Sequence, residues 1–348
     1  MTAPDSRTTV LAFLRRQGLL GEREDASLAP LTGGVSSDLW RVDLPGRTVC
    51  VKSALAQLNV AQEWLAPVSR NRVEYDWLRF AATVAPGQVP RVLADDAEAG
   101  LFAMEYLPPR HYPVWKAQLL AGHIEVGAAR AVGDLVGRIH AASAADPDSA
   151  ARFATDDNFD ALRIEPYLRS TARAHPDLRE QFATLASVTA GTHLAVVHGD
   201  VSPKNILLGP SGPVLLDAEC AWFGDPAFDV AFCVNHLLLK SVALPRLVAR
   251  LRSAAGALID AHRVHITWEP PQRLDQRVAA LLPALALARV DGTSPVEYLD
   301  AAQQEVVRTA ARTLLRHPAR TTAALLDRWE QSTTGTADIP TTVERAPQ

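Results

Sequence analysis

Residues 198–208 have the sequence HGDVSPKNILL and residues 214–219 have the sequence VLLDAE; these two stretches decide the fold. A third apolar run, AVV, stands at residues 195–197. Gly, Pro and Asp flank the runs, which predicts three short strands at residues 195–197, 206–208 and 214–216, joined by turns. Because hairpin-joined strands bring their ends together, we expect the polar residues at those ends to form one site.

These polar residues are suited to phosphoryl transfer. Asp200 lies five residues before Asn205 and 17 residues before Asp217. Mg²⁺ binds through a few carboxylate or carbonyl oxygens together with substrate phosphates, so Asn205 and Asp217 are predicted to hold it against a nucleotide. Asp200 is then left to orient and deprotonate an attacking hydroxyl, which makes Asp200 and Asn205 the candidate catalytic residues. The adjacent His198 is expected to orient the loop by hydrogen bonding.

Two features upstream match this interpretation. The segment GGVSS at residues 33–37 lies between two β-rich runs, where glycines let the backbone approach phosphate and hydroxyls donate to it. Lys52 ends the next strand, and Glu74 follows 22 residues later in a predicted helix. A lysine held by a glutamate and directed at phosphate oxygens is an ion pair of kinase-type sites. The predicted nucleotide-binding residues are therefore Gly33, Gly34, Ser36, Ser37, Lys52 and Glu74.

The first hundred residues predict a small antiparallel sheet with a leading helix and one further helix. Pro45-Gly46 is a turn dipeptide between two of the β-rich runs. Pro108-Pro109 interrupts regular structure, so residues 1–108 are predicted to form an N-terminal lobe and residues 109–330 a second lobe. The expected strands are Leu28–Thr32, Asp38–Leu44, Thr48–Ser53, Arg91–Ala94 and Gly100–Tyr106, and the expected helices are Val10–Leu20 and Arg70–Ala81.

The second lobe is predicted to be mainly helical. Val132, Leu135, Val136 and Ile139 recur at positions i, i+3, i+4 and i+7, which is typical of an amphipathic helix. Residues 331–348 are rich in Thr and Pro with little to bury, so we expect a disordered tail there.

Composition narrows the class of protein. With 348 residues, of which 48% are hydrophobic and 21% charged, the chain has enough apolar material for a buried core. A net charge of −4 argues against non-specific binding to nucleic acids or anionic membranes. Cys50, Cys220 and Cys233 lack CxxC spacing, and neither a secretory signal nor an apolar run of about 18 residues is present. The cytoplasm is therefore the expected location.

The combination of these motifs resembles the aminoglycoside phosphotransferase and choline kinase superfamily over about residues 28–330. The resemblance implies an α+β, bilobal protein-kinase-like fold with a small antiparallel-sheet N-lobe and a larger, mainly helical C-lobe. It also implies transfer of the γ-phosphoryl group of ATP, or GTP, to a hydroxyl of a small molecule, with Mg²⁺ as the metal. By the same resemblance, Met104, Glu105, Tyr106 and Leu107 join the lobes and contact the adenine.

A narrower similarity is to 5-methylthioribose kinases. It rests on VKSAL at residues 51–55, Glu63-Trp64, residues 72–74, DAECAWFG at residues 217–224, Phe228-Asp229 and residues 287–290. In that family the acid and the glutamate of the DAECAWFG-like segment bind metal, which implies this role for Asp217 and Glu219. Two departures stand out. The family's adjacent arginines align with Leu282-Pro283 here, and its catalytic loop lacks the Asn at position 205.

The acceptor stays open at this stage. A polyamine calls for a carboxylate-rich lobe, a sugar for neutral hydrogen bonds, and choline for an aromatic cage. The acidic stretch at residues 156–165 fits either a cationic acceptor or a solvated surface. The candidate substrate contacts are Asp200, Glu219, Trp222 and Arg289.

Other functions are weighed against a small-molecule kinase. A protein kinase is disfavoured because residues 218–230 contain no Ser, Thr or Tyr for an activation-loop phosphosite. A catalytically inactive, kinase-like nucleotide-binding protein and 5-methylthioribose kinase proper stay as alternatives. The chain is expected to be a monomer or a homodimer that binds neither nucleic acid nor membrane.

Overall fold

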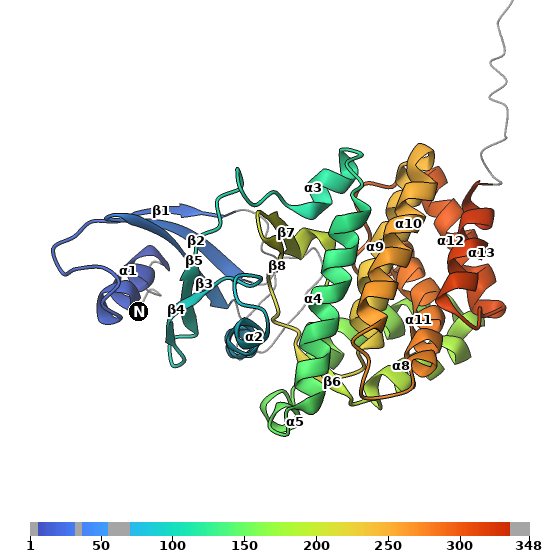
Figure 1. Ribbon diagram of the computed structural model, residues 1–348, viewed down its shortest axis with the longest axis horizontal. Helices are drawn as coiled ribbons and strands as arrows, with labels where there is room; N and C mark the ends of the chain where they lie inside the picture. The colour runs from blue at the N-terminus through green and yellow to red at the C-terminus, as the bar shows by residue number, and fades with distance from the viewer. Residues whose placement is uncertain (1–5, 32–36, 55–69, 335–348) are drawn as a thin grey trace, which may run out of the picture.

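The computed structural model describes residues 6–31, 37–54 and 70–334. Its first part is a five-stranded antiparallel sheet in the order β1-β2-β3-β5-β4 (Figure 1). The strands are β1 (Ser27–Pro30), β2 (Ser37–Leu44), β3 (Arg47–Ala54), β4 (Val92–Asp96) and β5 (Leu101–Glu105). Helix α1 (Ser6–Arg16) precedes the sheet, and α2 (Arg70–Val84) connects β3 to β4 in the sequence. The predicted antiparallel sheet with its two helices is thus confirmed.

Alternating side chains give this sheet two buried faces. Val51 of β3 belongs to an apolar cluster that also contains Phe13 of α1. Its neighbour Cys50 belongs to a second cluster, with Trp77 of α2. Because successive side chains of a strand point to opposite faces, α1 and α2 cover opposite sides of the sheet. Lys52, two residues after Cys50, therefore lies on the α2 face.

The second part of the chain is mainly helical. In the described residues, no helix is both long enough and apolar enough to pass through a membrane. The helices are α3 (Trp115–Leu120), α4 (Val126–Ala145), α5 (Ser149–Arg152), α6 (Asp156–Phe159), α7 (Ser170–Ala174), α8 (Arg179–Ala190), α9 (Ala227–Ala243), α10 (Val248–Arg263), α11 (Pro271–Asp291), α12 (Ala301–Arg316) and α13 (Thr322–Thr334). A π-helix, η1 (Asp160–Arg169), joins α6 to α7, and short 3-10 turns occur at η2 (Pro176–Leu178), η3 (Pro203–Asn205) and η4 (Pro245–Leu247).

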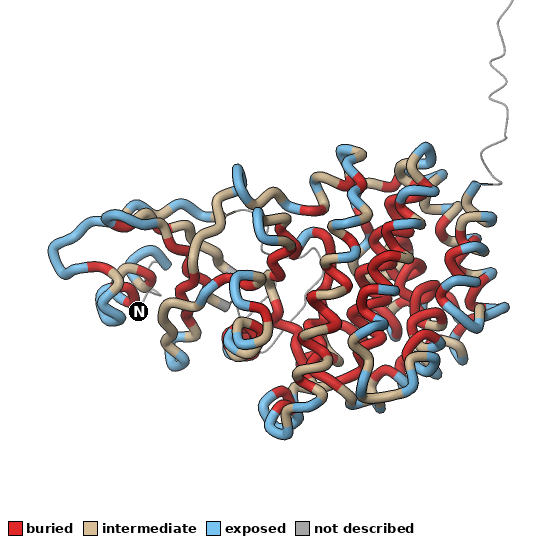
Figure 2. Tube along the Cα trace, in the orientation of Figure 1, coloured by how far each residue is buried: buried red, intermediate tan, exposed pale blue. Residues whose placement is uncertain are grey.

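Helix α9 forms the centre of this lobe. It is buried along almost its whole length, and Figure 2 shows the buried residues concentrated on the central helices. Two glycines bring α4 close to α10. A Cβ at Gly133 would lie 2.1 Å from the carbonyl oxygen of Leu258, and one at Gly137 would lie 3.1 Å from that of His262. This close packing of α4, α10 and α9 makes the helical lobe a rigid support for the loops beside it.

The short strands differ in one respect from the prediction. Strands β7 (Ile206–Gly209) and β8 (Gly212–Leu215) form the expected hairpin, but β6 (Ala195–Val197) pairs with β9 (Trp222–Gly224). Residues 198–205 and 216–221 each run from one strand pair to the other. The polar residues of both segments are therefore brought together, although by two ribbons and not by a three-stranded meander.

The end of the helical lobe also differs from the prediction. Helix α13 continues to Thr334, so the first four residues of the expected tail, 331–334, are helical. Trp329 of α13 is buried and donates from Nε1 to the Ser241 Oγ of α9 at 3.3 Å, which ties this helix to the core. Residues 335–348 lie outside the described residues. The lobe boundary at Pro108-Pro109 stays a prediction.

Candidate active site

Helix α9 anchors the loop that carries Asp200. Asp229, in the first turn of α9, accepts hydrogen bonds from the backbone N–H of His198 at 2.7 Å and of Gly199 at 2.8 Å. Its Oδ2 also lies 3.1 Å from Nε2 of His140 in α4, and the Asp229 side chain is buried. One carboxylate therefore fixes the backbone immediately before Asp200.

His198 is a second anchor of this loop. Its Nδ1 lies 3.1 Å from the backbone N–H of Asp200, and its Nε2 lies 3.1 Å from the carbonyl oxygen of Leu216. An amide N–H donates and a carbonyl accepts, so the ring is neutral and carries its proton on Nε2. Burial lowers the pKa of His198, which favours the same neutral form. The geometry confirms the prediction that His198 orients the loop.

Two cations hold the carboxylate of Asp200. Nη2 of Arg163 lies 2.9 Å from Oδ2 of Asp200, and Nζ of Lys204 lies 3.2 Å from the same oxygen. Burial alone would raise the pKa of Asp200, but the charges of Lys204 and Arg163 outweigh it and lower this pKa. Asp200 is therefore ionised at neutral pH. Its Oδ1 accepts no hydrogen bond from the described residues, which leaves that oxygen for a ligand.

The sequence analysis missed Arg163. This residue of η1 is 7% exposed, donates from Nη1 to the Leu162 carbonyl at 2.7 Å, and donates from Nε to the Gly199 carbonyl. It thus holds both the backbone and the carboxylate of the Asp200 loop. No spacing rule marks an arginine in an acidic stretch as inward-facing. The available signal is Pro166, which removes a backbone donor inside a helical segment and accompanies the π-helical geometry.

The acidic stretch around Arg163 is a solvated surface. Asp160 pairs with Arg169 and Glu165 with Arg173, and Asp156 lies 2.8 Å from Nε2 of His193. The two arginines neutralise part of the negative charge that a cationic acceptor would require. The surface interpretation of residues 156–165 is therefore the better of the two.

Lys52 lies between two carboxylates on the other side of the site. Its Nζ is 2.5 Å from Oε2 of Glu74 and 2.5 Å from Oδ1 of Asp217, and the residue is 4% exposed. Burial raises the pKa of Glu74 to about 7 against the opposing charge of Lys52, and nearby Asp217 adds to the rise. For Asp217, burial alone would raise the pKa, but the charges of Lys52 and Lys204 and the hydrogen bond from Lys52 together lower it. The predicted Lys52–Glu74 ion pair is present, and Asp217 completes a three-residue cluster.

The backbone at Asp217 has an uncommon conformation. Its φ of 66° lies in the left-handed region, where non-glycine residues are uncommon, although Asp is found there more often than most residues. Such conformations persist where the surrounding contacts impose them, and they concentrate at functional sites. Here the contact is the ion pair with Lys52, which draws the side chain from the end of β8 toward β3.

A group of oxygens next to this cluster fits a divalent metal. Asn205 donates from Nδ2 to the Asp200 carbonyl at 3.2 Å, and its Oδ1 has no partner in the described part of the chain. The Asp217 side chain is 30% exposed, so its carboxylate is open to a ligand. Oε2 of Glu219 lies 3.2 Å from Nε of buried Arg70. In residues 6–31, 37–54 and 70–334, no three His, Cys, Asp or Glu side chains form a metal-binding group. A metal would therefore need Asn205 and phosphate oxygens besides Asp217, a donor set that suits Mg²⁺.

Several predicted nucleotide contacts stay predictions. Gly33, Gly34 and Ser36 lie outside the described residues, as do Glu63 and Trp64. Ser37 begins β2 opposite Ala54. Met104 and Glu105 end β5, and Tyr106 and Leu107 continue from it toward the helical lobe. Their backbone groups lie where the chain passes from sheet to helices, which is compatible with the predicted adenine contact.

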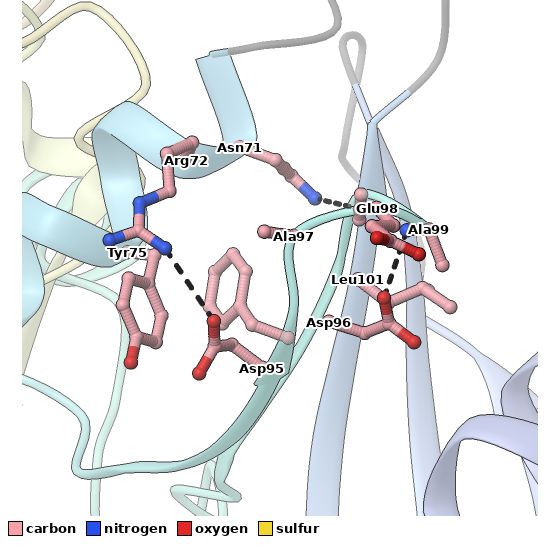
Figure 3. A pocket seen from close by; sticks show the side chains of 11 residues that line it. Asn71, Arg72, Tyr75, Asp95, Asp96, Ala97, Glu98, Ala99 and Leu101 are labelled. Carbon is pink, nitrogen blue, oxygen red and sulfur yellow. Dashed lines mark hydrogen bonds and ion pairs between the residues drawn. The ribbon is translucent and has the colours of Figure 1, made fainter.

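A pocket on the N-terminal lobe lies apart from the catalytic loop. It is lined by the start of α2 and by residues 95–102, and Figure 3 shows Arg72 and Asp95 facing each other across it. Asn71, at its edge, donates from Nδ2 to the Gly100 carbonyl at 2.7 Å and to the Lys52 carbonyl at 3.4 Å. These bonds fix α2 against β3, so they help to place Glu74 beside Lys52.

Of the two remaining predicted substrate contacts, Trp222 is buried away from any substrate, and Arg289 stays a prediction. Trp222 is 1% exposed and stacks on Phe159 with ring centroids 4.4 Å apart, so a substrate cannot reach its ring. The prediction of Trp222 as a substrate contact is therefore wrong. Trp222 is a core residue of β9, because its large apolar ring packs inside the protein. Arg289 of α11 is half-buried, with Nη1 2.9 Å from Ser294 Oγ and 3.3 Å from the Tyr167 hydroxyl.

Comparison with known proteins identifies the family of this chain. The model of a family described as "Phosphotransferase enzyme family" matches residues 27–244. The methylthioribose kinase of Yersinia pseudotuberculosis serotype O:3 is 24% identical over 247 residues, which is 64% of this chain and 60% of that relative. The methylthioribose kinase of Pectobacterium atrosepticum is 25% identical over 247 residues, 64% of this chain and 61% of that relative. The chain thus spans about 60% of the length of the curated relatives that it matches.

Solved structures share the fold. A choline/ethanolamine kinase family protein from Mesorhizobium loti has a TM-score of 0.51 at 17% identity and covers 95% of this chain and 99% of its own. An amicoumacin kinase has a TM-score of 0.54 at 14% identity, with 90% of this chain and 97% of its own covered. The fold is therefore that of the kinase-like proteins, as the sequence predicts.

Proposed function

The chain belongs to the phosphotransferase enzyme family, and we propose that it transfers the γ-phosphoryl group of ATP to a hydroxyl of a small molecule. The proposal rests mainly on the position of Asp200. Its ionised carboxylate is fixed by Arg163 and Lys204 on a loop that Asp229 and His198 anchor. A rigid carboxylate with one open oxygen is what an attacking hydroxyl requires for orientation.

The nucleotide side of the proposed site comprises β3, α2 and residues 216–219. Lys52 contacts Glu74 and Asp217 there, and it would also donate to nucleotide phosphates. Members of this family use ATP and a divalent metal in general; we propose Mg²⁺, with GTP as the alternative nucleotide. Asp217 and Asn205 would hold the metal with help from Glu219, and the metal would neutralise phosphate charge. The predicted loop at residues 33–37 and residues 104–107 would complete the contacts with phosphates and adenine.

The reaction would use Asp200 as a hydrogen-bond acceptor for the substrate. The acceptor hydroxyl donates to Asp200, and its oxygen forms a bond to the γ-phosphorus while the bond from that phosphorus to the β–γ bridging oxygen breaks. The hydroxyl proton passes to Asp200, and ADP leaves. The low pKa of Asp200 is compatible with this role because phosphoryl transfer has a loose transition state, in which positioning contributes more than base strength.

Two alternatives from the sequence are less well supported. A catalytically inactive nucleotide-binding protein would not need a carboxylate held as Asp200 is. For 5-methylthioribose kinase proper, the positions that align with the family's paired arginines are Leu282 and Pro283, and both are buried in α11. They offer no polar side chain to a sugar. We also propose a cytoplasmic location, with a monomer or a homodimer to be decided by light scattering.

The test is ADP release with Mg-ATP over a panel of acceptors. The panel contains methylthioribose, other pentoses and hexoses, aminoglycosides, choline and homoserine. One acceptor or acceptor class should give turnover with the wild type and none with Asp200→Asn, while both proteins bind Mg-ATP alike. Tight Mg-ATP binding without phosphorylation of any acceptor, in purified form or in cell extract, would favour the inactive nucleotide-binding protein.

A further inference from the structure

Cations of η1, α3, α9 and α11 lie beside the rings of Tyr167 and Tyr298 in the helical lobe, and we call this region the acceptor side. Arg163 contacts Asp200, and its guanidinium lies 5.8 Å from the centroid of the Tyr167 ring. The guanidinium of Arg289 lies 5.9 Å from the centroid of the same ring. Tyr167 thus connects Arg289 with the arginine that holds the proposed catalytic carboxylate.

A second pair of cations meets at Tyr298. Nζ of Lys240 lies 4.8 Å from the centroid of this ring, and Nζ of Lys116 lies 5.8 Å from it. Lys240 is fully buried in α9, and its nearest polar contacts are long: 3.4 Å to the His236 carbonyl and 3.5 Å to the Tyr298 hydroxyl. Burial, reinforced by Lys116, lowers the pKa of Lys240 to about 7.

A chain of contacts joins the two pairs of cations. The ring centroids of Tyr167 and Phe232 are 5.3 Å apart, those of Phe232 and His236 are 5.5 Å apart, and the His236 carbonyl accepts from Lys240. In agreement with this geometry, burial lowers the pKa of His236 well below the usual value, and four charges act in the same direction. These charges belong to Lys240, Arg289, Lys204 and Lys116. They come from α9, α11, the catalytic loop and α3, so distant segments converge here. We call these four residues the basic cluster.

The basic cluster has too few carboxylates. Lys204 is paired with Asp200, and Lys116 with Glu297 at 2.5 Å. Neither Arg289 nor Lys240 lies within ion-pair distance of a carboxylate in the part of the chain that the structure describes. Nε of Arg289 is buried and has no hydrogen-bond partner there. A buried donor without a partner is costly, so an anion that accepts from Nε of Arg289 would satisfy it and would also supply the missing counter-charge.

Elsewhere in the described chain, comparable cations are paired. Buried Arg70 lies beside Glu219, buried Lys52 beside Glu74, and Arg277 binds both Asp225 and Glu269. The missing carboxylates at Arg289 and Lys240 are therefore a feature of the acceptor side and not a general property of this fold.

We infer that the acceptor carries an anionic group, a carboxylate or a phosphate, besides the hydroxyl that is phosphorylated, and that Arg289 is the main ligand of this group. The inference rests on the proposed function. Arg289 is half-buried and Lys204 is 53% exposed in its side chain, so both can be reached from solvent. Lys240 lies behind Tyr298 and adds positive potential. Because Asp200 repels an anion, the anionic group would lie toward Arg289 while the hydroxyl meets Asp200.

Matched acceptors test the inference. D-glycerate is compared with glycerol, and ribose 5-phosphate with ribose, so that the two arms separate a carboxylate from a phosphate; choline is the cationic control. We expect an anionic acceptor to have a kcat/KM at least about 10-fold above its neutral match. Preference for a neutral or cationic acceptor, with turnover that depends on Asp200, would overturn the inference and leave the proposed function intact.

Variants of α11 provide a second test of the inference. Arg289→Gln should raise the KM for the anionic acceptor about 10- to 100-fold with little change in kcat, because a charge-assisted contact is lost. It should leave the KM for a neutral acceptor unchanged, and Arg289→Lys should recover part of the affinity. Arg273→Gln, at an exposed position of the same helix, is the matched control. Equal KM values for Arg289→Gln and Arg273→Gln would overturn the inference.

A binding measurement needs no turnover. With Mg-AMP-PNP bound, so that the nucleotide site is filled, malonate or inorganic phosphate is titrated and the shift in Tm is measured. Stabilisation of the wild type and of Arg273→Gln, but not of Arg289→Gln, would support the anion site even if every acceptor in the panel failed. Equal stabilisation of all three proteins would contradict it.

Discussion

The cations on the two sides of Asp200 differ in whether they have carboxylate partners. On the nucleotide side, Lys52 contacts two carboxylates and Arg70 contacts Glu219. On the acceptor side, Arg289 and Lys240 have no carboxylate within ion-pair distance among the described residues. The nucleotide side therefore carries counter-charges for Lys52 and Arg70 before any ligand binds, whereas Arg289 and Lys240 on the acceptor side have none in the described residues. The difference indicates that metal and nucleotide join a balanced site, while the acceptor has to supply negative charge.

The largest effect is expected at the boundary between the two sides. Asp200→Asn keeps the shape of the side chain but removes the charge that accepts the hydroxyl proton. We expect kcat to fall by about 100- to 10,000-fold, with the Kd of Mg-ATP almost unchanged. Single-turnover phosphorylation and nucleotide titration measure the two quantities. A comparable loss in both would mean that Asp200 supports the structure of the loop.

Removing the cation of the nucleotide side should be the next largest effect. Lys52→Met leaves Glu74 and Asp217 without the positive charge between them. We expect kcat/KM for ATP to fall at least about 30-fold, because truncating one member of a buried charge pair leaves the others uncompensated. The KM for the acceptor should stay the same. A parallel rise in the acceptor KM would remove the distinction between the two sides.

The sequence predicted the nucleotide side better than the acceptor side, and the reason is physical. Lys52, Glu74, Asp200 and Asp217 stand at the ends of short strands or on one helix face, where local spacing fixes their positions. Arg163 lies within a surface stretch, and only a π-helical segment turns it toward Asp200.

Local sequence patterns also could not predict the pairing of β6 with β9 or the burial of Trp222. Strand β9, which pairs with β6, is held by the stacking of Trp222 on Phe159 and by a backbone hydrogen bond from the Phe223 N–H to the Phe153 carbonyl, and no local pattern contains these contacts. Trp222 follows Asp217 closely in the sequence, but its size places it in the core. The basic cluster comes from α3, α9, α11 and the catalytic loop, and only the tertiary fold brings these segments together.

Titration of Lys240 should change the KM for a carboxylate acceptor by a few-fold, which sharpens the comparison between the acceptor side and the nucleotide side. Its pKa of about 7 means that Lys240 loses its charge as the pH rises from 6 to 8. The KM for a carboxylate acceptor, which does not itself titrate there, should rise over this range. Lys240→Met should remove that rise and leave the pH dependence of the ATP KM as it is. The groups that face Lys240 are His236, Tyr298, Lys116, Arg289, Glu297 and Cys233.

The last prediction concerns stability in place of turnover, and it rests on the titration of Glu74 in the free protein. Its pKa is raised from 4.5 to about 7, so between these values the folded state keeps a proton that the unfolded state has released. The contribution of Glu74 to stability is therefore present below pH 4.5 and is lost as the pH rises toward 7, by at most about 1.4 kcal/mol per pH unit. Lys52, Asp217 and Glu219 are the charged groups around it.

Urea unfolding of the metal-free protein at pH 5, 6 and 7 measures this slope. The difference in the free energy of unfolding between wild type and Glu74→Gln should become less favourable to the wild type as the pH rises. Parallel curves for the two proteins would show that Glu74 does not titrate in this window.

The most direct measurement is the transfer of ³²P from Mg-[γ-³²P]ATP to matched hydroxyl acceptors by the wild type and by Asp200→Asn in parallel. The expected result is a labelled acceptor with the wild type only, strongest for an acceptor that also carries a carboxylate or phosphate. Equal labelling by both proteins, or nucleotide binding by both with no labelled acceptor even in cell extract, would contradict the assignment of Asp200 as the catalytic residue of a small-molecule kinase.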